Sequence, residues 1–386
     1  MTRKEFTRLF TLLGLGAPFL PACGAQLKEA PLKASDKVLI IGAGAAGLTA
    51  AYLLNQQGVE VQLLEADNRY GGRMKRTTTF ANFPIPTGAE WLHVERKVFD
   101  EIVNDEAVSV DIVTKPYDFE VDYALVDGER KSLKDLGFGI DQKFINASWY
   151  DFYDQYIVPS IQDKISLNQA VQSIDYSGEQ LLVVTGDTEY RADRVIVTVP
   201  LKLLQQKAIR FIPELPSEKL AAIDEVLVWD GCKAFIEFSE RFYPTAATTS
   251  LEDETDGHKL FYDAAYGQDT EKHILGVFAV GPVSDAYREL DEPSRINHIL
   301  AELDELFDGQ ASPNYVTHIF QDWSKEPYAQ GAYVHYFPDW RDIRTLGNAV
   351  ADKLYFAGDA YTDGNDWSSV HAAARSAIRV VEALVG

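Results

Sequence analysis

Cysteine is almost absent from this chain. The 386 residues include two cysteines, Cys23 and Cys232, which is too few for the disulfide framework of a small secreted domain. Cys232 lies in an apolar-patterned segment, which predicts a buried free thiol. Long apolar runs are also missing, because no segment reaches the roughly 20 residues that a transmembrane helix requires. We therefore expect no permanent membrane span.

Positive charge is scarce as well. The chain carries 36 Lys and Arg against 59 Asp and Glu, a formal net charge of −23. This balance disfavours a nucleic-acid partner, which needs basic patches, and it suits solubility or the attraction of cationic small molecules. With 46% hydrophobic and 12% aromatic residues, the chain can bury a large core, and its length indicates about two to three domains.

Residues 1–36 have the pattern of an export signal and a tether. Basic residues precede a short apolar stretch at 10–20, as in signal peptides. The segment TRKEF resembles a twin-arginine signal with Lys in place of the second Arg, and LPAC resembles a lipoprotein cleavage box. We expect a bacterial protein that is exported to the periplasm or anchored in the membrane by a lipid on Cys23, and export without lipidation remains an alternative.

The segment KVLIIGAGAAG at 37–47 has the pattern of a strand, a glycine turn and a helix. Gly42 permits the tight turn, Gly44 lets the backbone approach a pyrophosphate, and Gly47 lets the helix pack closely on the strand. The helix N-terminus then directs its free N–H groups at the phosphates. A second strand ends at Glu65, where a partner for a ribose hydroxyl is expected. The unit predicts a dinucleotide site.

Two further segments extend this unit. Gly71-Gly72-Arg73 offers flexible backbone and a cation for a pyrophosphate, although a solvated basic turn would have the same composition. The segment GAEWLH at 88–93 combines small residues with Trp91 and can lie against an aromatic cofactor. Trp91 as an ordinary core residue is the alternative.

The rest of the chain alternates strands with a few helices. Strands are expected at 166–171, 180–185, 194–199, 234–238, 259–262 and 274–280, with helices near 148–157 and at 293–307. The C-terminal segment FAGDAY leads through a loop into an Ala-rich helix. This second glycine turn can hold the cofactor from its other side.

These separated motifs resemble the flavin-containing amine oxidases. The motifs are GAGAAGL with Glu65, GGR at 71–73, GAEWLH, VIVTVPL, W…EPYAQGAYVHYFP and FAGDAY…SSVHAAARSA. The resemblance implies FAD rather than NAD. It also implies an α/β fold, a glutathione-reductase-like Rossmann domain for FAD with an interleaved α+β substrate domain built on a mixed sheet. We expect the FAD domain at 37–95, 166–210 and 345–386, and the substrate domain at 96–165 and 211–344.

The resemblance also assigns the cofactor residues. It places the pyrophosphate at the first glycine turn, the adenosine ribose at Glu65, the adenine beside the backbone of Val171 and the flavin ring near Val370. Asp359 stands where the family usually has Glu, and either carboxylate can accept from a ribityl hydroxyl. The complete expected set is Gly42, Ala43, Gly44, Ala46, Gly47, Glu65, Ala66, Gly72, Arg73, Gly88, Ala89, Glu90, Trp91, Val171, Trp323, Gly358, Asp359, Ser369 and Val370.

For catalysis, the resemblance implies an aromatic cage that guides an amine to the flavin. Tyr333 matches one wall, whereas Ser369 at the other wall has no ring, so Trp367 is the expected substitute. Ala332 occupies the place of the cysteine that links flavin covalently in some members, which implies non-covalent FAD. No metal is implied.

Many relatives also carry a lysine near flavin N5. The matching position here is Gln205. We expect the nearby Lys207 to take the role, and the alternatives are that Lys202 takes it or that both are ordinary surface lysines. His93 falls where some polyamine oxidases have an acidic residue in the substrate tunnel, and it can titrate near neutral pH or form a hydrogen bond in the pocket wall.

The expected activity is oxidation of the C–N bond of a small primary or secondary amine. Hydride passes to flavin N5, and oxygen is reduced to peroxide. Two alternatives remain open at this point: a related FAD-dependent dehydrogenase or desaturase with another acceptor, and a flavin-binding partner protein without turnover.

Overall fold

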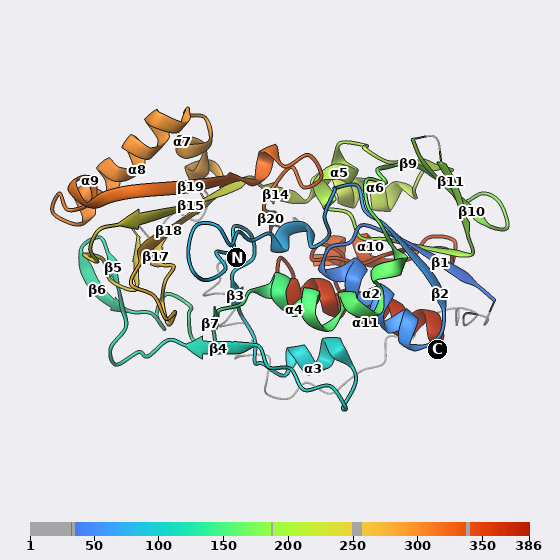
Figure 1. The fold of residues 1–386 in the computed structure, drawn as a ribbon. Helices are drawn as coiled ribbons and strands as arrows, with labels where there is room; N and C mark the ends of the chain where they lie inside the picture. The colour runs from blue at the N-terminus through green and yellow to red at the C-terminus, as the bar shows by residue number, and fades with distance from the viewer. Residues whose placement is uncertain (1–31, 33–34, 187, 249–256, 337–339) are drawn as a thin grey trace, which may run out of the picture.

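The computed structural model describes residues 32, 35–186, 188–248, 257–336 and 340–386 (Figure 1). The expected signal segment and Cys23 lie outside these residues. Cys232 is buried as a free thiol, as its apolar surroundings predict. Within the described ranges, no helix is both long and apolar enough to cross a membrane.

A five-stranded parallel sheet forms the centre of one of the two halves of the molecule. This half contains the expected FAD-binding segments and is called the cofactor half below. The order of the sheet is β21 (Leu354–Phe356), β12 (Arg194–Val197), β1 (Lys37–Ile41), β2 (Glu60–Leu64) and β8 (Ile165–Ser166). Alternate residues of β1 enter two different cores, since successive side chains of a strand point to opposite faces. Val38 and Ile40 join one core, and Leu39 and Ile41 join the other. The sheet is therefore the middle of three layers.

Helices cover one face of this sheet. The first core contains residues from α2 (Ala45–Gln56), α11 (Val370–Val385), α3 (Val98–Val103) and α4 (Trp149–Tyr156). Helices α2 and α11 pack directly on each other (Figure 1). Because α3 and α4 belong to this core, much of 96–165 packs with the cofactor half, although the sequence pattern placed this segment in the substrate domain.

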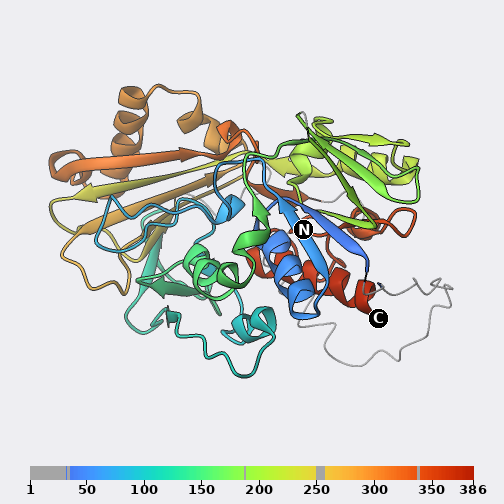
Figure 2. The same ribbon diagram turned by 45° about the vertical axis from the view of Figure 1, so that its right-hand side comes forward.

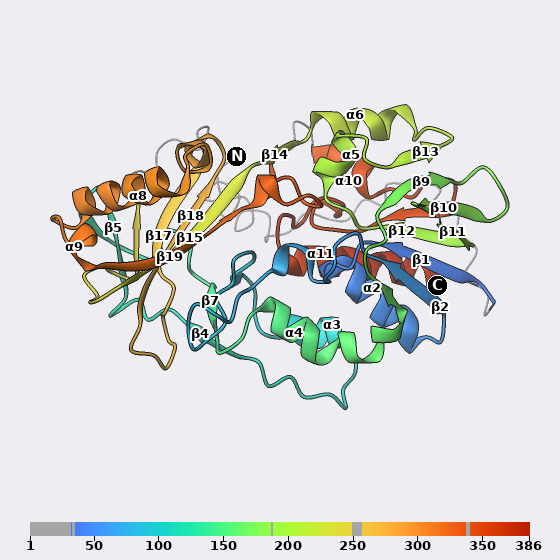
Figure 3. The same ribbon diagram turned by 45° about the horizontal axis from the view of Figure 1, so that its top comes forward.

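A second layer covers the opposite face (Figure 3). It contains a four-stranded sheet and three helices. The sheet order is β11 (Thr188–Ala192), β10 (Leu181–Thr185), β9 (Val171–Asp175) and β13 (Arg210–Ile212), and the helices are α5 (Leu201–Gln205), α6 (Ser217–Glu225) and α10 (Trp340–Gly347). The core of this layer continues to Val226. Residues 211–226 therefore pack with the cofactor half, beyond the boundary expected at 210.

The other half of the molecule is built on a seven-stranded mixed sheet (Figure 2). Helix α8 (Glu292–Leu306) lies on one face, at the position predicted by its apolar spacing. The short helices α7 (Asp285–Arg288) and α9 (Ala311–Asn314) flank it. The strand order is β19 (Tyr315–Asp322), β15 (Gly231–Phe238), β18 (His273–Val280), β17 (His258–Asp263), β16 (Ala246–Thr248), β5 (Tyr123–Val126) and β6 (Glu129–Ser132).

Two small sheets complete the structure. One has the order β3 (Trp91–Leu92), β7 (Gln142–Ile145) and β4 (Val113–Pro116), and the other pairs β14 (Leu227–Trp229) with β20 (Tyr333–Tyr336). One expected strand is wrong: 166–171 is divided between the ends of β8 and β9. Asn168 has a φ of 57° between them, a left-handed conformation that interrupts an extended strand.

Candidate functional site

The turn after β1 has the shape required to receive a phosphate group. Gly42 has a φ of 103°, which favours glycine. A Cβ on Gly47 would lie 1.9 Å from the carbonyl oxygen of Gly42, whereas a Cβ on Gly44 would meet nothing within 4 Å. Gly47 is thus required by close packing inside the unit, while Gly44 borders open space at the N-terminus of α2. These residues fit a bound pyrophosphate.

Glu65 closes this turn from the end of β2. The backbone N–H of Ala43 donates to its Oε2 at 2.7 Å, and the N–H of Asp67 donates to Oε1 at 2.8 Å. Burial raises the pKa of Glu65, although these two donors oppose the shift. Each carboxylate oxygen can accept more than one hydrogen bond, so Glu65 can still accept from a ribose hydroxyl.

Other expected residues lie around the same turn. The N–H of Gln169 donates to the carbonyl oxygen of Glu65 at 2.7 Å, which holds the start of β9, including Val171, near the end of β2. The N–H of Gly71 donates to the carbonyl oxygen of Ala43 at 2.8 Å, and a Cβ on Gly72 would lie 3.4 Å from the Cα of Gly44. The Gly71-Gly72 segment therefore packs against the Gly42–Gly44 turn. Val171, which is distant in sequence, lies near the same turn.

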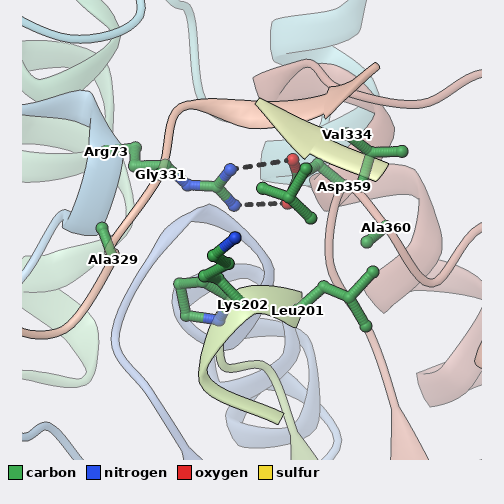
Figure 4. A pocket seen from close by; sticks show the side chains of 10 residues that line it. Arg73, Leu201, Lys202, Ala329, Gly331, Val334, Asp359 and Ala360 are labelled. Atoms are coloured by element: carbon green, nitrogen blue, oxygen red, sulfur yellow. Dashed lines mark hydrogen bonds and ion pairs between the residues drawn. The ribbon is translucent and has the colours of Figure 1, made fainter. Parts of the chain in front are cut away.

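Arg73 directs its guanidinium toward the C-terminal part of the chain. Its Nη1 and Nη2 lie 3.0 Å and 2.5 Å from the two carboxylate oxygens of Asp359, and Nη1 also donates to the carbonyl oxygen of Ala332 at 2.7 Å (Figure 4). We expected Arg73 to neutralise phosphates, but in this structure its planar fork binds Asp359. Lys202 from α5 lines the same small pocket.

The second glycine turn leads into α11 as predicted. The N–H of Gly358 donates to Oγ of Ser376 at 2.7 Å, which fixes the turn against the helix. Ser369 is the N-cap of α11, because its Oγ accepts from the N–H of Ala372 at 3.1 Å. Val370 is the first residue of the helix and is buried. Both α2 and α11 thus begin beyond the carboxyl ends of parallel strands, where open α/β sheets bind ligands.

The Gly88 segment joins this region to Trp323. A Cβ on Gly88 would lie 1.9 Å from the carbonyl oxygen of Arg73 and 2.9 Å from Cζ2 of Trp323. The N–H of Ala89 donates to the same oxygen of Arg73 at 3.0 Å. Trp323 is buried, and its Nε1 donates to the carbonyl oxygen of Thr87 at 3.0 Å. Only glycine fits at position 88.

Tyr333 lies on the ribbon between the two halves. Its ring is stacked on Phe278 of β18, with centroids 6.5 Å apart and an interplanar angle of 10°. Trp367 is half-buried and packs against the second core. His93 pairs with Asp141 through an Nδ1–Oδ1 distance of 2.9 Å.

Glu90 and Trp91 belong to the buried interior on the substrate side. Oε2 of Glu90 accepts from Nζ of Lys233 at 2.6 Å and from the phenol of Tyr262, and Oε1 binds Lys143. We expected Glu90 in the cofactor set, and in this structure both of its oxygens bind groups of the substrate side. Trp91 packs edge-on against Tyr262 at a centroid distance of 4.8 Å.

Lys233 is a buried lysine on the substrate side that the sequence pattern did not single out. Along β15, Cys232 and Ala234 face α8, whereas Lys233 faces Trp91. It is 4% exposed, and burial lowers its pKa. Lys207 is exposed beyond the end of α5, so the structure does not bring it to Tyr333. A lysine inside the apolar alternation GCKAFIEF was the signal that would have identified Lys233.

The aromatic rings connect Lys233 to Tyr333. Lys233 and Phe278 are direct partners in the register of β15 and β18. The Nζ of Lys233 lies 5.1 Å from the ring centroid of Trp91 and 6.0 Å from that of Phe278. Because Phe278 stacks on Tyr333, the buried amine of Lys233 lies next to a wall formed by these two rings. The same amine contacts the carbonyl oxygen of Pro86, just before the Gly88 segment.

Comparisons with known proteins agree with this geometry. Human "Lysine-specific histone demethylase 2" is 27% identical over 84% of this chain and 50% of its own length. "Polyamine oxidase 4" from Oryza sativa subsp. japonica is 25% identical over 96% of this chain and 92% of its own length. The chain spans about half the length of the histone demethylase.

A solved structure supports the fold. Wild-type putrescine oxidase bound to putrescine superimposes with a TM-score of 0.72 at 17% identity, covering 90% of this chain and 98% of that chain. The family model of an NAD(P)-binding Rossmann-like domain matches residues 40–104. The model described as flavin containing amine oxidoreductase matches residues 153–385. As this match covers more than half of the sequence, the chain belongs to the flavin-containing amine oxidoreductase family, and its cofactor is FAD.

Proposed function

We propose that this protein oxidises a small primary or secondary amine at its C–N bond and that oxygen accepts the electrons to give hydrogen peroxide. The observation that carries the proposal is the buried amine of Lys233 beside Trp91 and Phe278, with Tyr333 stacked on Phe278. The family and the polyamine oxidase relatives support the reaction class. The small size of the amine is inferred from those relatives.

The chain's own residues fit non-covalent FAD. The open space beside Gly44 would receive the pyrophosphate, Glu65 the ribose, and Asp359 a ribityl hydroxyl. Ala332 offers no sulfur for a covalent link. When bound, FAD supplies the acceptor for the hydride that leaves the carbon next to the amine nitrogen.

The remaining chemistry falls to protein side chains. Tyr333, Phe278 and Trp91 would orient the apolar part of the amine and exclude water. Free amines are protonated near neutral pH, but hydride leaves readily only from a carbon next to a neutral nitrogen. A neutral Lys233 would take one proton from the substrate ammonium, which leaves a neutral amine and a Lys233 ammonium held by Glu90.

Anaerobic mixing tests this function. The purified protein is mixed with a panel of monoamines, diamines, polyamines and amino acids while the flavin absorbance is followed. We expect at least one amine to bleach the flavin, and admission of air to restore the colour with formation of peroxide. Bleaching by other donors but by no amine would contradict the proposal. A flavin that amines reduce but oxygen does not restore would favour the dehydrogenase alternative.

Replacing Tyr333 tests the aromatic wall. We expect Tyr333→Ala to slow flavin reduction by up to about 10²-fold, since a misplaced substrate loses near-attack geometry, while FAD content is unchanged. The control is Tyr328→Ala, an exposed tyrosine on the preceding loop. Equal reduction rates in the two variants would remove Tyr333 from the site.

We also propose that the protein is exported and anchored through a lipid on Cys23. The motif LPAC at 20–23 supports this proposal. In a bacterial host, the full chain is expected in the membrane fraction, and Cys23→Ser in the soluble periplasmic fraction, as measured by fractionation and flavin fluorescence. Identical fractions for both proteins would argue against the anchor.

A further inference from the structure

Glu90, Lys143 and Lys233 form a buried cluster that the proposed reaction does not fully use. All three are 3–4% exposed. Lys233 binds Oε2 of Glu90 at 2.6 Å, and Lys143 binds Oε1. The carboxylate therefore lies between two ammonium groups that come from β15 and β7. Neither lysine belongs to the expected cofactor set.

The charges of this cluster do not balance. Two protonated lysines and one carboxylate leave a net charge of +1 in the interior, and an uncompensated buried charge is strongly unfavourable. Loss of one proton gives a neutral cluster. The two ammonium groups hold the pKa of Glu90 below its usual range despite burial, so the proton must come from a lysine.

The position of Lys233 indicates that it is the lysine that loses its proton. Both lysines lie near the rings of Trp91 and Tyr262. The Nζ of Lys233 also lies 5.8 Å from the ring centroid of Phe235 and 6.0 Å from that of Phe278, which stacks on Tyr333. Burial lowers the pKa of Lys233, Glu90 opposes this shift, and the Lys143 charge adds to it.

The two phenols beside the cluster add no charge to it. Burial raises the pKa values of Tyr117 and Tyr262 well above the usual value, so both phenols stay neutral. Next outward lie Asp141, which contacts Nδ1 of His93 at 2.9 Å, and Asp263, which forms an ion pair with Arg241 at 3.1 Å.

We propose that Lys143 is a positioning residue that acts through Glu90, keeping Lys233 as the group that receives the proton of the amine substrate. This inference rests on the proposed amine oxidation. Lys143 and Lys233 share the one carboxylate of Glu90, so Glu90 does not hold Lys233 as an ammonium before substrate arrives. Proton transfer breaks one N–H bond of the substrate ammonium and forms one on Lys233, and Glu90 then stabilises the new charge.

The test uses the FAD-loaded protein and two opposite substitutions. The limiting rate of anaerobic flavin reduction is measured against pH with the best amine of the panel. This rate rises with pH as Lys233 loses its proton. Lys143→Met removes a like charge, so we expect the acidic limb to move to higher pH by about one unit. Glu90→Gln removes the stabilising anion, so the limb moves to lower pH.

A second readout does not depend on turnover. The FAD-loaded protein is labelled with ¹³C at Cε of lysine and titrated by NMR, and the Lys233 resonance is assigned with Lys233→Arg. We expect the midpoint of the Lys233 titration to move to higher pH in Lys143→Met and to lower pH in Glu90→Gln. Lys143→Arg should return the midpoint toward that of the unsubstituted protein. Lys272→Met, which breaks the separate ion pair with Glu237, should leave it unchanged.

The outcomes separate the two proposals. If no amine reduces the flavin in any protein, the proposed function fails, while the NMR midpoints still decide the role of Lys143. Midpoints that move in the same direction in Lys143→Met and Glu90→Gln, or that do not move, would overturn the inference. We expect Lys143→Met to fold, because it leaves a neutral Glu90–Lys233 pair. If Lys143→Met does not fold, Glu90→Gln still tests the inference independently.

Discussion

Gly44→Val gives a folded protein without bound flavin. The reason is local, because a Cβ on Gly44 meets no protein atom within 4 Å and points into the space beside the N-terminus of α2. The valine methyl groups would occupy the volume expected for the pyrophosphate. Gly44 is an N-cap residue in an extended conformation, with a φ of −80°, so valine introduces no left-handed strain. We expect complete loss of the flavin absorbance.

The control must separate binding from folding. Gly139→Val is the matched variant, since the nearest contact of its Cβ is 3.9 Å away on the side chain of Lys134 and its φ is not in the left-handed region. Both variants should keep the circular dichroism spectrum of the unsubstituted protein, and only Gly139→Val should be yellow. Gly47→Ala should instead impair folding, because its Cβ would lie 1.9 Å from a backbone oxygen. A yellow Gly44→Val protein would refute this assignment of the phosphate site.

Lys233→Met is expected to slow amine-driven flavin reduction by about 10²–10⁴-fold, the usual contribution of a general base. FAD content should be unchanged, because no residue of the glycine turns contacts Lys233. The fold should also persist, since the variant leaves Glu90 paired with Lys143 as a neutral couple. Raising the pH should restore part of the rate, as more of the substrate then enters as neutral amine.

Lys207→Met is the matched control. Lys207 is the lysine that the sequence pattern favoured, but it is exposed after the end of α5. Its replacement should leave the reduction rate unaltered. If Lys207→Met slowed reduction and Lys233→Met did not, the assignment of the pocket lysine would be reversed.

The cofactor half was predictable because its determinants are local. Gly42, Gly44 and Gly47 lie within one turn, and the length of the following unit fixes the position of Glu65 at the end of the next strand. The family resemblance placed Val370 at the start of the last helix, and the structure has it there, after Ser369 as the N-cap of α11. Short-range spacing and backbone geometry decide these positions, so the pattern of residues is sufficient.

The substrate side was less predictable because its contacts cross long stretches of sequence. Glu90 and Lys233 are 143 positions apart, and only the packing of two sheets joins them. Gln205, where the lysine was expected, has a different role: its amide donates to the carbonyl oxygens of Ile223 and Val226 at 2.8 Å and 2.7 Å. It ties α5 to the end of α6, which also explains why the cofactor half extends past residue 210.

The ion pair between Arg73 and Asp359 also has a consequence for the order of synthesis. The two residues are 286 positions apart, and β21, the strand that completes the parallel sheet, spans Leu354–Phe356. A growing chain that has emerged from the ribosome through α2 thus has the Gly42–Gly47 side of the cofactor site. It still lacks the Gly358–Asp359 side. The ribosome must deliver the chain through β21 and Asp359 before FAD can meet both sides of its site, so we expect stable cofactor loading only after these residues have been synthesised.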